Sequence, residues 1–322
     1  MSNVVSREEF LQRRRSGLGG SDIGAILGVN KWKTAMQVYL DKVNPEPAND
    51  EGMSEAAYWG IELEDLVAKE YQRRTGNKVQ RVNAQMVRDD KPWMLANIDR
   101  AVVQDGSRAR LDKDGKLIGI KGLLECKTAS VYASAEWEGE SAPLSYVAQV
   151  QWYMAVTGAD WCDIAVLIGG QNFRIIRVER DNELIQTLTE RGELFWTECV
   201  QAKVPPQPTT SAEVLQLFPS STEDSVLATT DVELAISELK QLKTQIEDLE
   251  AKAEVCKTEI QIHMADKGQL IDVSGSVLVT WKSAKASSKT NWEAVAKACK
   301  PSPDIITQHT KEQAGSRRFL VK

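Results

Sequence analysis

The stretch Leu123-Leu124-Glu125-Cys126-Lys127-Thr128 joins an apolar segment to two charged side chains. It ends a strand that we predict over residues 117–128. Residues two apart on a strand share a face, so Glu125 and Lys127 project together while Cys126 points the other way. A second carboxylate, Asp99, ends an apolar stretch in the preceding predicted strand, residues 93–103. Two adjacent strands can bring Asp99 and Glu125 within a few ångströms of each other.

Two carboxylates on a mostly apolar sheet are costly unless a cation neutralises them. Mg²⁺ suits such a pair because it prefers oxygen ligands and bridges to phosphate. Lys127 adds a positive charge that can lower the pKa of a water or hold that water in line. The alternative is that Glu125 and Lys127 form an ordinary ion pair on a solvated sheet. The tripeptide alone favours that alternative, because such pairs are common and weakly stabilising.

Hydrophobic periodicity around this stretch predicts an α/β or α+β domain with helices packed on a central sheet. The predicted helices cover residues 34–43, 56–75, 146–157 and 182–201, and the other predicted strands cover residues 79–88, 162–168 and 173–178. Residues 44–54 read as a loop. In the second helix we expect one buried face made of Leu63, Leu66, Val67 and Tyr71.

A glycine-rich turn, Gly17-Leu18-Gly19-Gly20-Ser21-Asp22, precedes an apolar run, and Ser21 is the expected N-cap of a helix. Glycines allow a ligand to approach the backbone, and N–H groups at a helix N-terminus favour an anion. Arg14 can add a bidentate contact to phosphate. Asp22 would repel phosphate unless it caps the helix. The alternative is an ordinary helix cap.

The composition changes after about residue 203. Pro205-Pro206-Gln207-Pro208 and a Ser/Thr-rich segment predict a linker over residues 204–230, between a domain of residues 1–203 and an appendage of residues 231–322. The appendage opens with apolar residues at heptad a and d spacing over residues 232–263, a coiled-coil or helical-hairpin signal. A β-hairpin is expected over residues 270–282. Residues 282–322 hold nine basic and three acidic residues, which suits a polyanion, so we expect the appendage to hold DNA or a recombination partner. The alternative is a small basic domain packed on the acidic remainder of the chain.

Composition excludes several classes of protein. The 322 residues carry 40 Lys and Arg against 46 Asp and Glu, which excludes a histone-like, basic nucleic-acid binder. No apolar run reaches the roughly 18 residues of a membrane span. Five cysteines without C-x-x-C spacing argue against a disulfide framework or zinc ribbon. The two histidines, His263 and His309, exclude a histidine-based site in the first 250 residues. The first 15 residues show no signal peptide, so we expect a cytoplasmic protein.

Four blocks together resemble the YqaJ-type viral recombinase nucleases, the lambda-exonuclease branch of the PD-(D/E)xK superfamily. The blocks are Arg14-x-x-Gly17-Leu18-Gly19-Gly20-Ser21-Asp22, Gly60-Ile61-Glu62-Leu63-Glu64-Asp65, Asp99 with Glu125-Cys126-Lys127, and Tyr146-Val147-Ala148-Gln149-Val150-Gln151-Trp152-Tyr153. They span residues 14 to about 200 in the family's order. Ile98 stands before Asp99 where the superfamily name has proline.

The resemblance implies a restriction-endonuclease-like core and a role for each matched residue. Asp99, Glu125 and the carbonyl of Cys126 would hold Mg²⁺, with Mn²⁺ as a substitute, and Lys127 would activate the attacking water. The implied remaining residues are Glu64 to complete the metal site, Gln149 to orient the water or the lysine, and Arg14, Gly19, Gly20 and Ser21 to hold a DNA phosphate, plausibly a terminal 5′-phosphate. Helical period alone does not decide whether Glu62 or Glu64 completes the metal site. Without the resemblance, Gln149 would be interpreted as a solvent-facing amide.

The implied activity is resection of double-stranded DNA ends, 5′ to 3′, to leave 3′ single strands for a partner annealing recombinase. The gene would belong to a phage or prophage acting in the bacterial cytoplasm. Two rivals stay open, a structure-specific or nicking endonuclease on the same fold and a non-catalytic DNA-binding assembly protein. Lambda exonuclease suggests a ring-shaped homotrimer, whereas the heptad stripe permits a parallel dimer, a trimer or an intramolecular hairpin.

Overall fold

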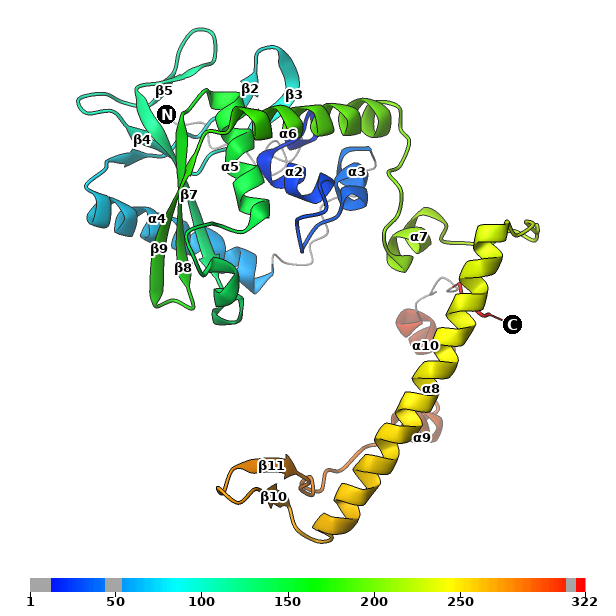
Figure 1. Cartoon of the computed structure of the whole chain (residues 1–322). Coiled ribbons are helices and arrows are strands. Elements are labelled where there is room, and N and C mark those ends of the chain that lie inside the picture. The colour runs from blue at the N-terminus through cyan, green and yellow to red at the C-terminus, as the bar shows by residue number, and fades with distance from the viewer. Residues whose placement is uncertain (1–12, 44–53, 311–316, 322) are drawn as a thin grey trace. The chain divides into compact units, whose positions relative to one another are not determined.

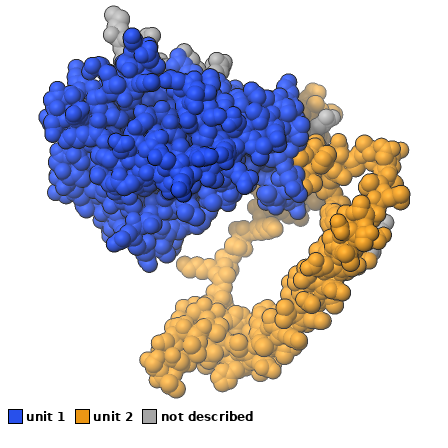
Figure 2. Space-filling model, turned by 45° about the horizontal axis from the view of Figure 1, so that its top comes forward, with its two compact units in different colours: residues 1–213 blue, residues 214–322 orange. Residues whose placement is uncertain are grey.

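The computed structural model describes residues 13–43, 54–310 and 317–321. The predicted loop at residues 44–54 lies outside this range except for its last residue, and so do the first twelve residues inspected for a signal peptide. The chain forms two compact units, Met1–Glu213 and Val214–Lys322 (Figure 2). In the described part of the chain, no helix combines the length and apolar character that a membrane crossing requires.

A five-stranded mixed sheet forms the centre of unit 1, in the order β1-β4-β7-β8-β9 (Figure 1). The strands are β1 (Val79–Gln80), β4 (Arg100–Val103), β7 (Ile120–Ala129), β8 (Trp161–Ile168) and β9 (Asn172–Glu179). The long strand β7 lies in the middle, antiparallel to β4 and parallel to β8, while β9 returns antiparallel to β8. The predicted mixed sheet flanked by helices is therefore confirmed.

Helices α4 (Glu55–Thr75) and α5 (Leu144–Thr157) lie on opposite faces of this sheet (Figure 1). The α4 face buries Val67, Ala68 and Tyr71 in one cluster with Leu124 of β7 and Ala165 of β8. Because side chains alternate along β7, the residues between those that face α4 turn toward α5.

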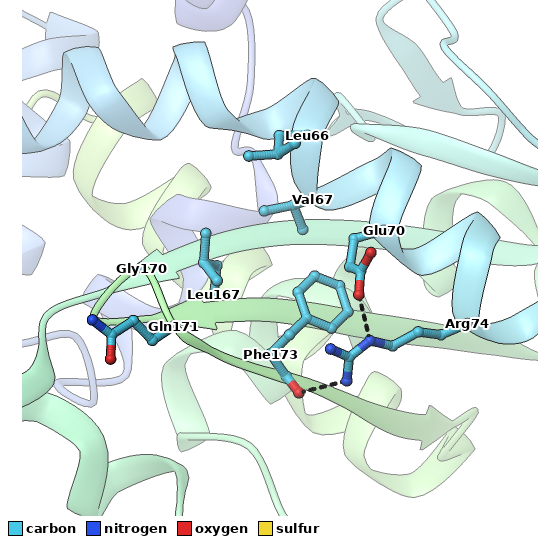
Figure 3. Close-up of a pocket in the computed structure, with 8 residues that line it drawn as sticks. All are labelled: Leu66, Val67, Glu70, Arg74, Leu167, Gly170, Gln171 and Phe173. Carbon is cyan, nitrogen blue, oxygen red and sulfur yellow. Dashed lines mark hydrogen bonds and ion pairs between the residues drawn. The ribbon is translucent and has the colours of Figure 1, made fainter.

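The predicted buried face of α4 is wrong at Leu66, which is 53% exposed. Leu66 instead lines a shallow pocket of about 250 Å³ with Leu167 and Phe173 at the turn between β8 and β9 (Figure 3). Ala68 takes the buried place beside Val67 and Tyr71.

Three predicted strands are each divided in the structure. Residues 117–128 hold β6 (Leu117–Ile118) and most of β7, with Gly119 between them. Residues 79–88 hold β1 and β2 (Met86–Arg88), and residues 93–103 hold β3 (Lys91–Ala96) and β4. β2 and β3 pair with each other as a separate hairpin, since the chain reverses direction between them. A break at residues 97–99 then places Asp99 directly before β4.

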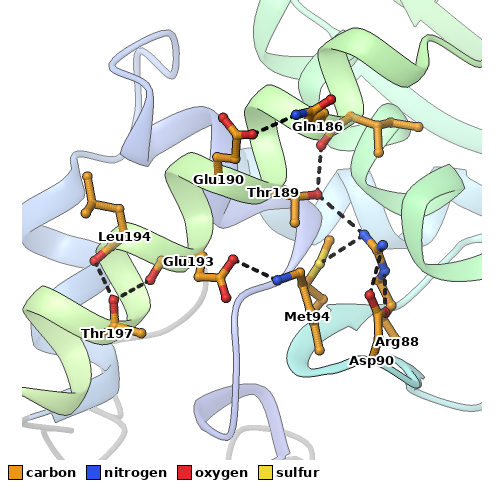
Figure 4. A network of polar contacts seen from close by, with 11 residues as sticks. Arg88, Asp90, Met94, Gln186, Thr189, Glu190, Glu193, Leu194 and Thr197 are labelled. Carbon is orange, nitrogen blue, oxygen red and sulfur yellow. Dashed lines mark hydrogen bonds and ion pairs between the residues drawn. The ribbon is translucent and has the colours of Figure 1, made fainter.

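Helix α6 (Asn182–Leu194) holds this hairpin through polar contacts (Figure 4). Lys91 Nζ lies 2.7 Å from Glu193 Oε2, and Arg88 donates to the Thr189 hydroxyl at 3.5 Å. A π-helical turn, Phe195–Gln201, continues α6 to the end predicted from the sequence.

The remaining described elements of unit 1 are α2 (Gly20–Ile26), α3 (Ala35–Val43), the short strands β5 (Arg110–Leu111) and β6 (Leu117–Ile118), and the 3₁₀ helix η1 (Val131–Trp137). Helix α7 (Ser211–Leu217) occupies part of the segment predicted as a linker and crosses the boundary between the units.

After the end of α7, the described part of unit 2 contains one long helix, a hairpin and two short helices: α8 (Thr230–Met264), β10 (Gln269–Ile271), β11 (Val277–Thr280), α9 (Trp292–Cys299) and α10 (Pro303–His309). The hairpin agrees with the sequence-based prediction. Among residues 214–310 and 317–321, Met264 is the one buried hydrophobic side chain.

Candidate active site

The pairing of β4 with β7 brings Asp99 to Glu125. Arg100 lies opposite Leu124 in the antiparallel register, so the residue before Arg100 meets the residue after Leu124. The backbone N–H of Cys126 donates to Asp99 Oδ2 at 2.8 Å, which fixes the Asp99 carboxylate against β7. The two carboxylates predicted to converge are therefore together.

Glu125 is the centre of a hydrogen-bonded group on the α5 side of the sheet. Its Oε1 accepts from Lys127 Nζ at 2.6 Å and from Gln149 Nε2 of α5 at 2.7 Å. This confirms that Glu125 and Lys127 share a face, and Cys126 packs on the opposite side against the α4 cluster. The other oxygen, Glu125 Oε2, is buried and has no hydrogen-bond partner among the described residues.

Burial and the neighbouring Glu125 charge raise the pKa of Asp99 well above its ordinary value. Burial opposes a charge on Lys127, but the Glu125 and Asp99 carboxylates outweigh burial and raise the pKa of Lys127 above its ordinary value. Lys127 is therefore an ammonium donor at neutral pH. The group presents two acidic side chains, one ammonium and an unsatisfied carboxylate oxygen, a donor set that accepts a further cation.

One face of α5 contributes three residues to this group. Tyr146, Gln149 and Tyr153 recur at helical spacing; Lys127 Nζ lies 5.0 Å from the centre of the Tyr146 ring, and Gln149 Nε2 donates to the Tyr153 hydroxyl at 2.7 Å. Burial, followed by the Glu125 charge, raises the pKa of Tyr153 well above its ordinary value. The two tyrosines were not predicted as site residues, although their i, i+3, i+7 spacing with Gln149 is the signal that finds them.

Glu64 lies on α4 at the edge of this group, where arginines hold it. Its Oε1 accepts from Arg100, and from Arg81 Nη2 at 3.0 Å. Arg100 also donates to Asp65 and, at 2.6 Å, to the carbonyl of Asp99. Among the described residues, no three His, Cys, Asp or Glu side chains are grouped closely enough to hold a metal ion. The predicted ligand Glu64 is thus close to Asp99 but paired with cations.

Two backbone hydrogen bonds join the glycine-rich turn to the β2–β3 hairpin next to the site. The N–H of Leu18 donates to the carbonyl of Trp93 at 2.6 Å, and the N–H of Leu95 donates to the carbonyl of Leu18 at 2.9 Å. Helix α2 then begins at Gly20 with Gly19 as its N-cap, so the prediction of Ser21 as the N-cap is wrong. The tight turn allows the backbone of Gly19, two residues earlier than predicted, to cap the helix.

Asp22 accepts a hydrogen bond from the N-terminal end of α2, and two lysines neutralise its charge. It accepts the Gly19 N–H at 3.1 Å and pairs with Lys42 at 2.9 Å and Lys33 at 3.2 Å. Burial opposes its ionisation, but Lys42, Lys33 and Arg14 outweigh burial and lower the pKa of Asp22 to about 2. The carboxylate therefore belongs to the scaffold of the turn.

Arg14 and Ser21 lie beside this ion-paired group, with Arg14 Nη2 donating to the Ser21 hydroxyl at 3.2 Å. Gly20 connects the turn to α5: a Cβ atom at Gly20 would lie 2.6 Å from the Tyr153 ring and 2.9 Å from the Gln149 carbonyl. The absence of a side chain thus lets α2 pack directly on the α5 face that carries Gln149 and Tyr153.

This chain is similar to a known protein over its whole length. The chain is 35% identical over 328 residues to the uncharacterized protein YqaJ of Bacillus subtilis (strain 168), covering 100% of this chain and 96% of that protein. Residues 9–160 match the YqaJ-like viral recombinase domain. An alkaline exonuclease from Laribacter hongkongensis is similar over 61% of this chain and 94% of its own, with 20% identity and a TM-score of 0.46. A phage-related exonuclease from Haemophilus somnus 129PT is similar over 58% and 95% respectively, with 15% identity and a TM-score of 0.43. On the full-length identity and the domain match, the chain belongs to the YqaJ-like viral recombinase family.

Proposed function

We propose that this protein is a Mg²⁺-dependent deoxyribonuclease that resects the ends of double-stranded DNA. The observation that carries the proposal is the buried, unsatisfied Glu125 Oε2 in a group that also holds Asp99 and the Lys127 ammonium. Folded proteins rarely leave a buried polar atom without a hydrogen-bond partner unless that atom has a function. A divalent cation would supply the missing charge, and Mn²⁺ would substitute because it takes the same oxygen ligands.

Asp99, Glu125 and the carbonyl of Cys126 would hold the ion. When bound, Mg²⁺ stabilises the charge that develops on the oxygens of the phosphate under attack. Glu64 would join this set only by exchanging its contact with Arg100. Arg100 thus neutralises the charge of the Glu64 carboxylate, which lies next to two other acidic side chains.

Lys127 would orient the attacking water as a hydrogen-bond donor. Its pKa is raised, so at neutral pH it holds a proton rather than removing one. Gln149 holds the Glu125 carboxylate from the opposite side, and Tyr146 covers the lysine. These contacts fix the two reactive side chains before substrate binds, which reduces the entropy lost in reaching the transition state.

The glycine-rich turn is proposed to position the DNA by a backbone phosphate. Arg14 and Ser21 would contact the phosphate, and a terminal 5′-phosphate bound there would give 5′ to 3′ degradation. The product would be a 3′ single strand, which suits an annealing recombinase as partner in a phage-encoded, cytoplasmic pathway. Membership in a viral recombinase family supports this assignment.

Digestion of linear duplexes labelled at either end, in Mg²⁺ and in EDTA, tests the proposal. The expected result is metal-dependent release of nucleotides from the 5′-ended strand, with a covalently closed circle left intact. Cutting of the circle would instead establish the endonuclease. Binding without cleavage in Mg²⁺ and Mn²⁺ would refute the enzyme and favour the assembly protein. The matched control is Lys127→Ala, which should bind DNA without cutting it.

A further inference from the structure

Unit 2 exposes the residues that would ordinarily make a core. Met264 is the one buried hydrophobic side chain among its described residues, while α8 leaves Leu242, Ile246 and Leu249 about half or more exposed. A unit of this size cannot offset the conformational entropy of folding without burying apolar surface. The apolar stripe of α8 therefore needs a partner face.

The stripe has the pattern of a two-stranded coiled coil. Heptad positions a are Val232, Leu239, Ile246, Ala253 and Ile260, and positions d are Ala235, Leu242, Leu249, Cys256 and His263. Three of the five a residues are β-branched, and two of the five d residues, Leu242 and Leu249, are leucines. This combination favours two parallel strands over three or four. The 35 residues of α8 provide five heptads, enough for a stable zipper.

We propose that α8 pairs, parallel and in register, with α8 of a second copy of this chain. In that arrangement Glu238 at position g faces Lys243 at position e of the other copy, an attractive pair formed twice by symmetry. Lys252 and Lys257 also face each other, but Glu254 lies 3.0 Å from Lys257 on the same helix and offsets the repulsion. The antiparallel arrangement that keeps Ile246 opposite Leu249 would place Glu238 beside Glu259 and Lys243 beside Glu250, so each arrangement has one attractive and one repulsive pair. The residues at positions a and d therefore decide for the parallel pair.

The parallel pair places Cys256 opposite the same residue of the second copy. Facing d positions in a coiled coil lie close enough for a disulfide, whereas in the antiparallel arrangement Cys256 faces Leu239. Cys256 is exposed in the single chain, as is Cys299. This inference does not depend on the proposed nuclease activity.

The experiment uses the full-length chain. Light scattering should give twice the mass of one chain, and Ile246→Glu should reduce it to that of a single chain, because a buried a-position charge disrupts the zipper. Thr244→Glu, two residues earlier on the outer f position, is the matched control and should keep the double mass. Circular dichroism and urea unfolding check that Ile246→Glu leaves unit 1 folded.

Mild oxidation then tests orientation. A non-reducing gel should show a cross-linked pair that Cys256→Ser abolishes and Cys299→Ser preserves. A single-chain mass for the wild type would overturn the proposal, as would an oligomer unaffected by Ile246→Glu. A double mass without cross-linking through Cys256 would overturn the parallel arrangement and point to the antiparallel one.

Discussion

Replacing Asp99 with asparagine should stabilise the metal-free protein while abolishing cleavage. Burial and the Glu125 charge raise the pKa of Asp99, so the folded protein holds this carboxyl group at a cost in the absence of a cation. An amide at position 99 can still accept the N–H of Cys126, as Asp99 does at 2.8 Å. It also brings an N–H donor next to a group whose Glu125 Oε2 has no partner among the described residues.

The magnitude follows from the buried like charges. Burial of a polar group without compensation costs about 1–3 kcal/mol, so Asp99→Asn, which removes the charge beside Glu125, should raise the free energy of unfolding in EDTA by about that amount. Mg²⁺ should cancel this advantage. An ion at 100 times its dissociation constant adds about 2.7 kcal/mol to the wild type, and little to a variant that lacks one ligand.

Urea unfolding followed by circular dichroism, in EDTA and in Mg²⁺, measures both effects. Asp90→Asn is the matched control, because Asp90 is an exposed residue that pairs with Arg88 away from the site. Two results would refute the reasoning: an Asp99→Asn protein less stable than the wild type in EDTA, or equal stabilisation of both proteins by Mg²⁺. Either would mean that Asp99 and Glu125 do not form a strained cation site.

Three further predictions concern the glycine-rich turn. Asp22→Ala leaves Lys42 buried without its carboxylate and should cost about 3–5 kcal/mol in urea unfolding, whereas the double change Asp22→Ala with Lys42→Met should cost less. The pKa of Asp22 falls from 3.8 to about 2 on folding, so its contribution to the free energy of unfolding is complete above pH ~4 and is lost as the pH falls through about 2. Between pH 5 and pH 2 the stability difference between the wild type and Asp22→Asn should therefore change by about 2 kcal/mol. Arg14→Ala should reduce the preference for 5′-phosphate over 5′-hydroxyl ends about tenfold or more in the ratio of kcat/KM values, with loss of about 1.5–3 kcal/mol on phosphorylated ends; equal loss on both ends would indicate general backbone binding.

The sequence was sufficient to predict the mixed sheet and the meeting of Asp99, Glu125 and Lys127. Strand alternation places Glu125 and Lys127 on one face, and the resemblance of the motif blocks to a known family links Asp99 to them. It failed where a tertiary contact decided the outcome. Gly19 caps the helix in place of Ser21 because backbone hydrogen bonds hold the turn against β3, more than 70 residues further along the chain. Leu66 lies outside the buried face because Ala68, rather than Leu66, packs with Val67 and Tyr71 against the sheet.

Tyr153 and the pairing of Glu64 with Arg100 were missed for different reasons. Tyr153 lies four residues after Gln149 on α5, a spacing that places both side chains on one face of the helix. The Arg100 contact joins α4 to the start of β4 and has no signature in local sequence. Long-range pairing of this kind is visible only once the elements are packed.

The bonding of the glycine-rich turn to β3 has a consequence for how the site opens. The turn is held on two sides, by the hydrogen bonds of Leu18 with β3 and by the packing of Gly20 against Gln149 and Tyr153 of α5. Leu18 is fully buried, so the turn cannot separate from β3 without exposing apolar surface and loosening the helix face that holds Glu125. Native-state hydrogen exchange should then show the amides of Leu18, Leu95 and Cys126 exchanging through openings of similar free energy. The glycine-rich turn and the acidic group would thus form one cooperative unit.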